Sequence, residues 1–214
     1  MMKMHWVMKI AGLSAGMILS AAAVAGPLLN GDFSSGTNGF ESWKGELDNG
    51  GPPVVSLTTD ADFGTYSTSY SASAGAATLT NDNGDDFYHV SLFQSFDVPV
   101  TAGTLALSLD YEWSVSSLDD LVQASLEDSS SVFYDLFAGL TPAMTASGTI
   151  NYDITGLAGD TVELYFLVED ADWVETDWLR VGNITITETL SVPAPPVLVL
   201  LLAGLAGLAY RRCR

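Results

Sequence analysis

The chain has 214 residues, of which 48% are apolar, and it carries 26 Asp and Glu residues against 7 Lys and Arg, a formal net charge of −19. The apolar fraction excludes a disordered acidic polymer. The excess of negative charge excludes nucleic acid as a partner and disfavours anionic membrane surfaces, because like charges repel. The only cysteine, Cys213, excludes a disulfide framework and a thiolate metal site in the body of the protein.

The N-terminus has the three parts of a secretory signal peptide. A basic segment with Lys3 and Lys9 precedes an apolar run, and the small residues Ala23 and Ala25 stand just before Gly26. The apolar run is short and has no stop-transfer flank, which argues against a permanent anchor. We expect residues 1–25 to be removed on export, so that the mature chain begins at Gly26.

The C-terminal residues 191–214 also have three parts. An apolar run over residues 197–210 has no polar face and predicts a short transmembrane helix in the inner membrane. It is followed by a basic end that would stay in the cytoplasm and stop translocation, made up of Arg211, Arg212 and Arg214. It is preceded by a proline motif that keeps the backbone extended, made up of Val192, Pro193, Ala194 and Pro195.

This three-part tail resembles the PEP-CTERM sorting signal of Gram-negative bacteria, in its Val-Pro-x-Pro variant. The type motif has Glu where this chain has Ala194. The resemblance implies that an exosortase, a membrane-embedded transpeptidase, cuts the chain near residues 192–195. The precursor would then be anchored in the inner membrane, and the mature form would reach the cell surface or the medium.

Residues 26–190 alternate between apolar and polar side chains in several segments. The clearest alternation has an apolar face made up of Leu105, Leu107, Leu109, Tyr111, Trp113 and Val115. Residues 90–98 and 161–168 show the same period of two, which is typical of strands with one buried face. Weaker candidate strands are 54–58, 76–80, 121–126, 132–138, 149–154 and 179–187.

No helical period is sustained between residues 26 and 190, and Gly, Asn, Asp, Ser and Pro clusters separate the candidate strands. About nine short strands with regular turns predict one all-β domain, an antiparallel β-sandwich of the jelly-roll kind. We expect no buried helix in it. The predicted organisation is therefore a signal peptide, a sandwich over residues 26–190 and a sorting signal over residues 191–214.

Three segments resemble carbohydrate-binding jelly rolls of the galactose-binding-like kind: residues 28–43, 96–115 and 158–186. That resemblance implies a structural calcium ion that ties the first loop to the last strand, with Asp32 and Asp177 as the matching carboxylates. Calcium is bound by six to eight oxygens. Residues 169–177 contain five acids, for which we expect diffuse attraction of divalent ions rather than a defined site.

Aromatic side chains are the candidates for glycan binding, because sugars stack on aromatic faces. Trp43 and Trp173 lie in polar loop sequences and are the predicted stacking residues, whereas Trp113 has the apolar parity of its strand and is predicted to be core.

No catalytic residue is predicted. His89 is the only histidine of the mature body and stands beside a strand start, where a structural role is expected. No nucleophile elbow is present, zinc ligands are missing, and with 26 acids some carboxylate pair is inevitable.

Two hypotheses for function follow. The first is a non-catalytic surface or extracellular-matrix protein, associated with exopolysaccharide and sorted by an exosortase, whose acidity keeps it soluble and lets divalent ions bridge it. The alternative is a secreted carbohydrate-binding module that recognises a specific glycan. A glycosidase is a weaker third hypothesis.

Overall fold

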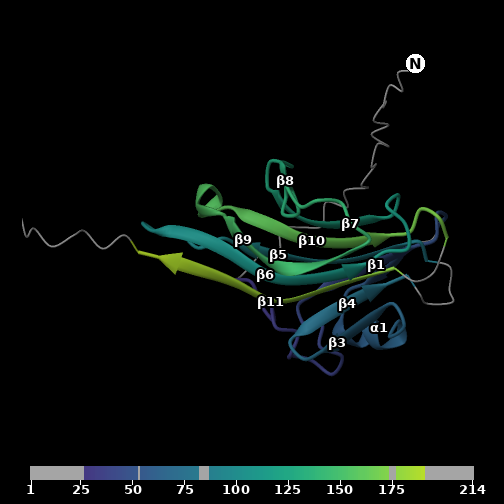
Figure 1. Cartoon of the computed structure of the whole chain (residues 1–214). Helices are drawn as coiled ribbons and strands as arrows, with labels where there is room; N and C mark the ends of the chain where they lie inside the picture. The colour runs from purple at the N-terminus through teal and green to yellow at the C-terminus, as the bar shows by residue number, and fades with distance from the viewer. Residues whose placement is uncertain (1–26, 53, 82–86, 174–176, 191–214) are drawn as a thin grey trace, which may run out of the picture.

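The computed structural model describes residues 27–52, 54–81, 87–173 and 177–190, which form two antiparallel β-sheets packed face to face (Figure 1). The six-stranded sheet has the order β2-β1-β5-β10-β7-β8, and the five-stranded sheet has the order β3-β4-β11-β6-β9. The predicted all-β antiparallel sandwich is confirmed.

The strands of the six-stranded sheet are β1 (Lys44–Asp48), β2 (Val55–Leu57), β5 (His89–Asp97), β7 (Leu121–Asp128), β8 (Phe133–Asp135) and β10 (Thr161–Glu169). Those of the five-stranded sheet are β3 (Tyr70–Ser73), β4 (Ala76–Thr80), β6 (Thr104–Ser114), β9 (Thr145–Asp153) and β11 (Trp178–Thr189). Two short helices are α1 (Asp60–Thr65) and η1 (Thr155–Leu157).

The alternation in the sequence marks the core. In β6, Leu105, Leu107 and Leu109 are at most 1% exposed and Trp113 is 7% exposed, while the residues between them face outward. The strands β5 and β10 bury their apolar faces in the same way. Side chains of the two inner faces therefore form one continuous core between the sheets.

The structure differs from the sequence prediction in three elements. Strands β1 and β3 were not predicted, so the described residues contain eleven strands rather than about nine. The expectation of no buried helix is wrong, because α1 buries Phe63 against the core. The carboxylate of Asp62 holds the start of this helix by accepting the backbone N–H groups of Thr58 at 3.0 Å and Thr59 at 2.8 Å.

Asp60, the first residue of α1, organises the loop before β1. Its carboxylate accepts hydrogen bonds from the backbone N–H groups of Thr37 (2.7 Å), Asn38 (3.0 Å) and Phe40 (2.8 Å). Burial raises the pKa of the Asp60 carboxyl, but these hydrogen bonds outweigh that effect and hold its pKa below the usual 3.8. The loop delivers Phe40 to an aromatic cluster that is made up of Phe33, Phe40, Trp43, Phe63 and Tyr70.

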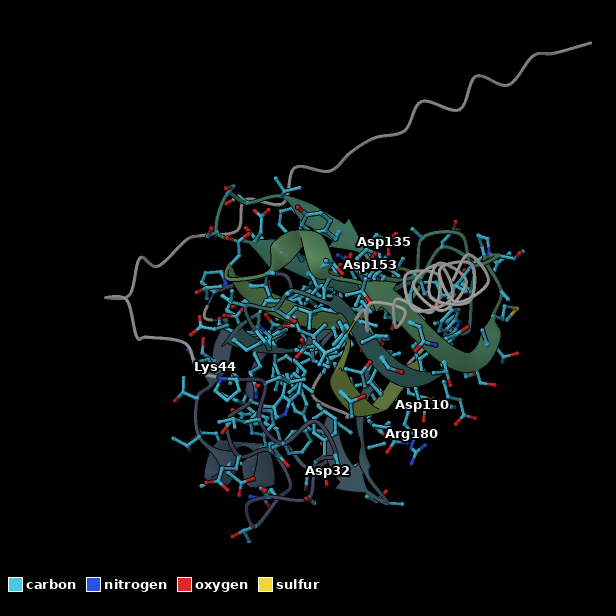
Figure 2. The ribbon with its side chains drawn as sticks, turned by 90° about the vertical axis from the view of Figure 1, so that its left-hand side faces the viewer. Asp32, Lys44, Asp110, Asp135, Asp153 and Arg180 are labelled. Atoms are coloured by element: carbon cyan, nitrogen blue, oxygen red, sulfur yellow. The ribbon has the colours of Figure 1, made fainter. Side chains whose placement is uncertain are left out.

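Positive charge is scarce on the folded domain. Lys44 begins β1 and Arg180 lies in β11, and Figure 2 shows them on opposite sides of the molecule. In the part of the chain that the structure describes, the only ion pair joins His89 to Glu169, with 3.6 Å between Nδ1 and Oε2. The many carboxylates are therefore held by hydrogen-bond donors rather than by cations.

The two predicted address segments lie outside the described residues, including the cleavage site at Ala25 and Gly26 and the tail from residue 191 onward. Within the described ranges, no helix is long and apolar enough to cross a membrane.

Candidate functional site

A pocket of about 490 Å³ opens at one edge of the sandwich, beside the part of β7 that β8 does not cover. It is defined here as the edge pocket. Its walls come from the end of β6, the β6–β7 connection, β7, the end of β8 and the segment before β9. The residues used below are Trp113, Ser117, Leu118, Asp120, Leu121, Gln123, Asp135, Phe137 and Leu140.

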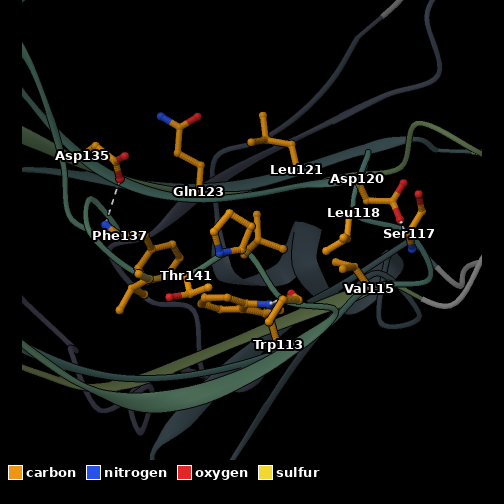
Figure 3. Close-up of a pocket in the computed structure, with 14 residues that line it drawn as sticks. Trp113, Val115, Ser117, Leu118, Asp120, Leu121, Gln123, Asp135, Phe137 and Thr141 are labelled. Atoms are coloured by element: carbon orange, nitrogen blue, oxygen red, sulfur yellow. Dashed lines mark hydrogen bonds between the residues drawn. The ribbon is translucent and has the colours of Figure 1, made fainter. Parts of the chain in front are cut away.

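Aromatic rings form the floor of the edge pocket (Figure 3). The alternation of β6 turns Trp113 inward, and its indole N–H donates to the carbonyl oxygen of Ala143 at 3.0 Å. Tyr111 stacks against Trp113 with ring centroids 5.2 Å apart, and Phe137 packs on it at the same distance. Neighbouring side chains and the backbone therefore contact the Trp113 ring on several sides.

Polar side chains lie above this floor. Asp135 accepts the backbone N–H of Phe137 at 2.8 Å (Figure 3), and Asp120 accepts that of Ser117 at 2.7 Å. The amide of Gln123 donates to Ser125 Oγ at 3.2 Å. The bonds of Asp135 and Asp120 orient two carboxylates at a site that also contains an aromatic surface. The Gln123 amide points away from Trp113 (Figure 3), because its neighbour Ala124 is the residue that faces the core.

The rim of the edge pocket exposes apolar side chains. Leu118 is 65% exposed, Leu121 is 43% exposed and Leu140 is 36% exposed. All three line the same pocket. Exposed apolar groups that gather at one concave place mark a binding surface more often than scattered ones do.

A second hollow, of about 430 Å³, lies on the outer face of the five-stranded sheet. There Asp110 accepts hydrogen bonds from Thr149 Oγ1 at 2.6 Å and from the Asn183 amide at 2.7 Å. The bonds from Thr149 and Asn183 lower the pKa of Asp110. Since Asp110 already bonds to Thr149 and Asn183, this carboxylate is less available to a ligand than those of the edge pocket.

An acidic cluster lies at the same end of the sandwich as the edge pocket. It is made up of Asp120, Asp170 and Asp177, each of which offers a carboxylate oxygen within 4.8 Å of the others. Asp170 is 4% exposed and Asp177 is fully buried. Burial, together with the charges of Asp120 and Asp170, raises the pKa of Asp177 to about 6, although it accepts the backbone N–H of Ser116 at 2.6 Å.

The structure does not bring together the predicted calcium ligands Asp32 and Asp177. The Asp32 carboxylate is exposed and accepts the Ser34 hydroxyl at 2.9 Å. Its backbone lies beside Gly75, which also neighbours Asn183. Asp177 stands six positions before Asn183, which corresponds to about 20 Å along an extended strand.

The two predicted stacking residues have different environments. Trp43 is 1% exposed, packs on Phe33 and Phe166, and donates its indole N–H to the carbonyl oxygen of Asn30 at 3.0 Å. The prediction of an exposed stacking ring at Trp43 is wrong, because the aromatic cluster encloses it. Trp173 is 62% exposed and lies outside the edge pocket, so its role stays a prediction.

His89, for which a structural role was expected, bonds to neighbours on the outer face of the six-stranded sheet. Its Nε2 lies 3.2 Å from the hydroxyl of Tyr165, and its other ring nitrogen faces Glu169. Trp113, predicted only as core, also supplies the pocket floor.

No protein-family model and no curated protein sequence matches this chain. Among solved structures it is similar to TmCBM61 in complex with β-1,4-galactotriose, at 17% identity and a TM-score of 0.40, over 77% of this chain and 99% of that one. It is also similar to the N-terminal cellulose-binding domain of β-1,4-glucanase C from Cellulomonas fimi, at 16% identity and a TM-score of 0.39, over 78% and 100%. An alginate lyase from Pseudomonas aeruginosa is similar at 8% identity and a TM-score of 0.40, over 69% and 99%.

Proposed function

We propose that the protein is an exported, non-catalytic glycan-binding protein and that the edge pocket is its binding site. The observation that supports this proposal is the aromatic floor at Trp113 and Phe137 with the oriented carboxylate of Asp135 beside it. The apolar face of a sugar ring stacks on such a floor, while its hydroxyl groups need donors and acceptors at the sides.

The charge of the site favours a neutral glycan over an acidic one. Asp120 and Asp135 line the edge pocket, whereas neither Lys44 nor Arg180, the two bases of the described residues, does. Carboxylates without cations repel the uronate groups of acidic polysaccharides. We therefore expect uncharged glycans as ligands and weak or no binding to alginate.

Replacing Asp135 by alanine is expected to weaken glycan binding by about fivefold to thirtyfold, because a sugar hydroxyl loses a hydrogen bond worth about 1–2 kcal/mol. Affinity electrophoresis of the purified protein in gels that contain cellulose derivatives, β-galactan, xylan or alginate measures the effect. Asp48→Ala is the matched control, since this carboxylate also accepts the backbone N–H two positions further on, that of Gly50 at 2.8 Å, but lies at the end of β1, toward the other edge of the sheet and outside the pocket.

The proposed ligand class would be contradicted if no neutral polysaccharide retarded the unaltered protein, or if alginate alone did. An equal loss of binding in Asp135→Ala and Asp48→Ala would place binding outside the edge pocket. The first hypothesis, an exported matrix protein without a specific glycan, would then be preferred.

We further propose that the domain reaches the surface through its two address segments. The signal peptide would direct export. An exosortase-type enzyme would cut the tail at the motif of residues 192–195, which contains Pro193 and Pro195. The prolines would keep this motif extended at the outer surface of the inner membrane, where a helix would hide its peptide bonds.

Replacing both Pro193 and Pro195 by alanine is expected to trap the full-length chain in the inner membrane. Cell fractionation followed by mass spectrometry of both termini measures this. The unaltered chain should begin at Gly26 and lack its residues after about position 195. Unaltered protein that keeps Arg214 and stays in the inner membrane would instead be a plain membrane-anchored protein.

A further inference from the structure

The acidic cluster brings three chain segments and both sheets together at one point. Asp120 lies in the connection from β6 to β7, Asp170 follows β10, and Asp177 precedes β11. Strands β7 and β10 belong to the six-stranded sheet, and strands β6 and β11 belong to the five-stranded sheet. A ligand held by these three carboxylates would link the sheets where they come together.

Hydrogen bonds from the surrounding backbone hold two of these carboxylates in place. Asp120 accepts the N–H of Ala171 at 2.9 Å, in addition to that of Ser117. Asp170 accepts the N–H groups of Asp172 at 3.0 Å and Trp173 at 2.6 Å. The acids are thus directed toward one another although their charges repel.

The cluster lacks a balancing charge among the described residues. None of its carboxylates forms an ion pair there, since the single ion pair of the described ranges is the one between His89 and Glu169. Buried carboxylates are costly unless a cation or hydrogen bonds compensate them. Oδ2 of Asp177 is buried and has no hydrogen-bond partner, in a side chain with no exposed surface.

We propose that Asp120, Asp170 and Asp177 bind one calcium ion. The donors are all oxygens, which suits a hard cation and not zinc. Oxygens that coordinate calcium at about 2.3–2.6 Å lie up to about 5 Å from one another, and the spacing within 4.8 Å in the cluster fits this range. Magnesium requires shorter bonds and a stricter octahedron.

The ion would also stabilise one wall of the edge pocket. Asp120 lines that pocket together with its neighbours Ser117 and Leu118, so a bound ion restrains the same connection. This consequence rests on the proposed function. The site itself does not, because its residues and its charge are independent of any glycan.

Thermal unfolding of the purified protein tests the site. After removal of metal with EDTA, CaCl2 at about a hundredfold excess over Kd is expected to raise the unfolding midpoint by about 5–10 °C. Isothermal titration calorimetry measures the Kd and should find one calcium ion bound to each chain. MgCl2 should have a smaller effect, and NaCl at equal ionic strength should not reproduce the shift.

Asp177→Asn is expected to abolish both the shift and the titration signal. Asp119→Asn is the matched control, since it removes the same charge from an exposed neighbour of Asp120 and should keep both. If Asp177→Asn does not fold, Asp120→Asn replaces it, because that residue is partly exposed.

A full shift with NaCl, or an unchanged calcium shift in the variant that folds, would overturn the site and leave only screening of the acidic surface. A calcium shift without glycan binding would leave the site intact and reject the proposed function. Glycan binding without a calcium shift would support the proposed function and reject the calcium site.

Discussion

Replacing Leu109 by alanine is expected to lower the free energy of unfolding by about 2–5 kcal/mol, because it removes buried methyl groups and leaves a cavity. Leu109 lies in the middle of β6, between β11 and β9, and has no exposed surface. Because β6 is paired on both sides, its backbone relaxes little into the space. Urea denaturation of the purified protein measures the change.

Leu118→Ala is the matched control for this substitution. It removes the same atoms from a side chain that is 65% exposed, so a change within about 0.5 kcal/mol is expected. A loss below about 0.5 kcal/mol for Leu109→Ala would mean that β6 presents the opposite face to the core.

Replacing Asp60 by alanine is expected to cost about 2 kcal/mol of unfolding free energy. The substitution leaves the backbone N–H groups of Thr37, Asn38 and Phe40 without their acceptor, and hydrogen bonds to a charged group are stronger than neutral ones. Water reaches part of this loop and compensates for part of the loss. Glu41→Ala, at an exposed side chain of the same loop, should change stability by less than about 0.5 kcal/mol.

The Asp60 contribution should depend on pH in one direction. Its pKa is lower in the folded protein than in the unfolded chain, so the contribution is complete above the unfolded value and is lost as the pH falls through the folded value. The difference in unfolding free energy between the unaltered protein and Asp60→Ala is therefore expected to be constant near pH 6 and to shrink below about pH 4. A difference that grows on acidification would show that other groups hold the loop.

Period-two alternation was sufficient to predict the central strands and their buried faces, because β5, β6 and β10 each have one apolar parity. It was insufficient for β1, where Gly45 and charged residues carry no such pattern and the pairing partner β5 determines the strand. The helix α1 has only six residues, too few for a helical period, and its start depends on local hydrogen bonds of Asp62.

The candidate site was only partly predictable. Asp177 was selected from the sequence, but its partners Asp120 and Asp170 depend on how the ends of β7, β10 and β11 meet. The acid-rich residues 169–177 were the available signal, and without Asp120 from another loop they predict only diffuse ion attraction. Its alternating position in β6 predicted Trp113 as a core residue. Its second role, as the floor of the edge pocket, depends on the segment before β9, in which Ala143 accepts the indole N–H, and the sequence does not show that this segment lies beside Trp113.

The placement of the two bases, Lys44 and Arg180, limits where proteases of one class can cut the domain. Enzymes of the trypsin type cut after lysine and arginine, and residues 45–179 contain neither. Lys44 pairs with Phe93, and Arg180 lies in a strand bonded to β4 on one side and β6 on the other. A protease that needs an extended, unpaired backbone can therefore cut after these residues only when the strands separate. The folded domain is expected to resist this class of enzyme.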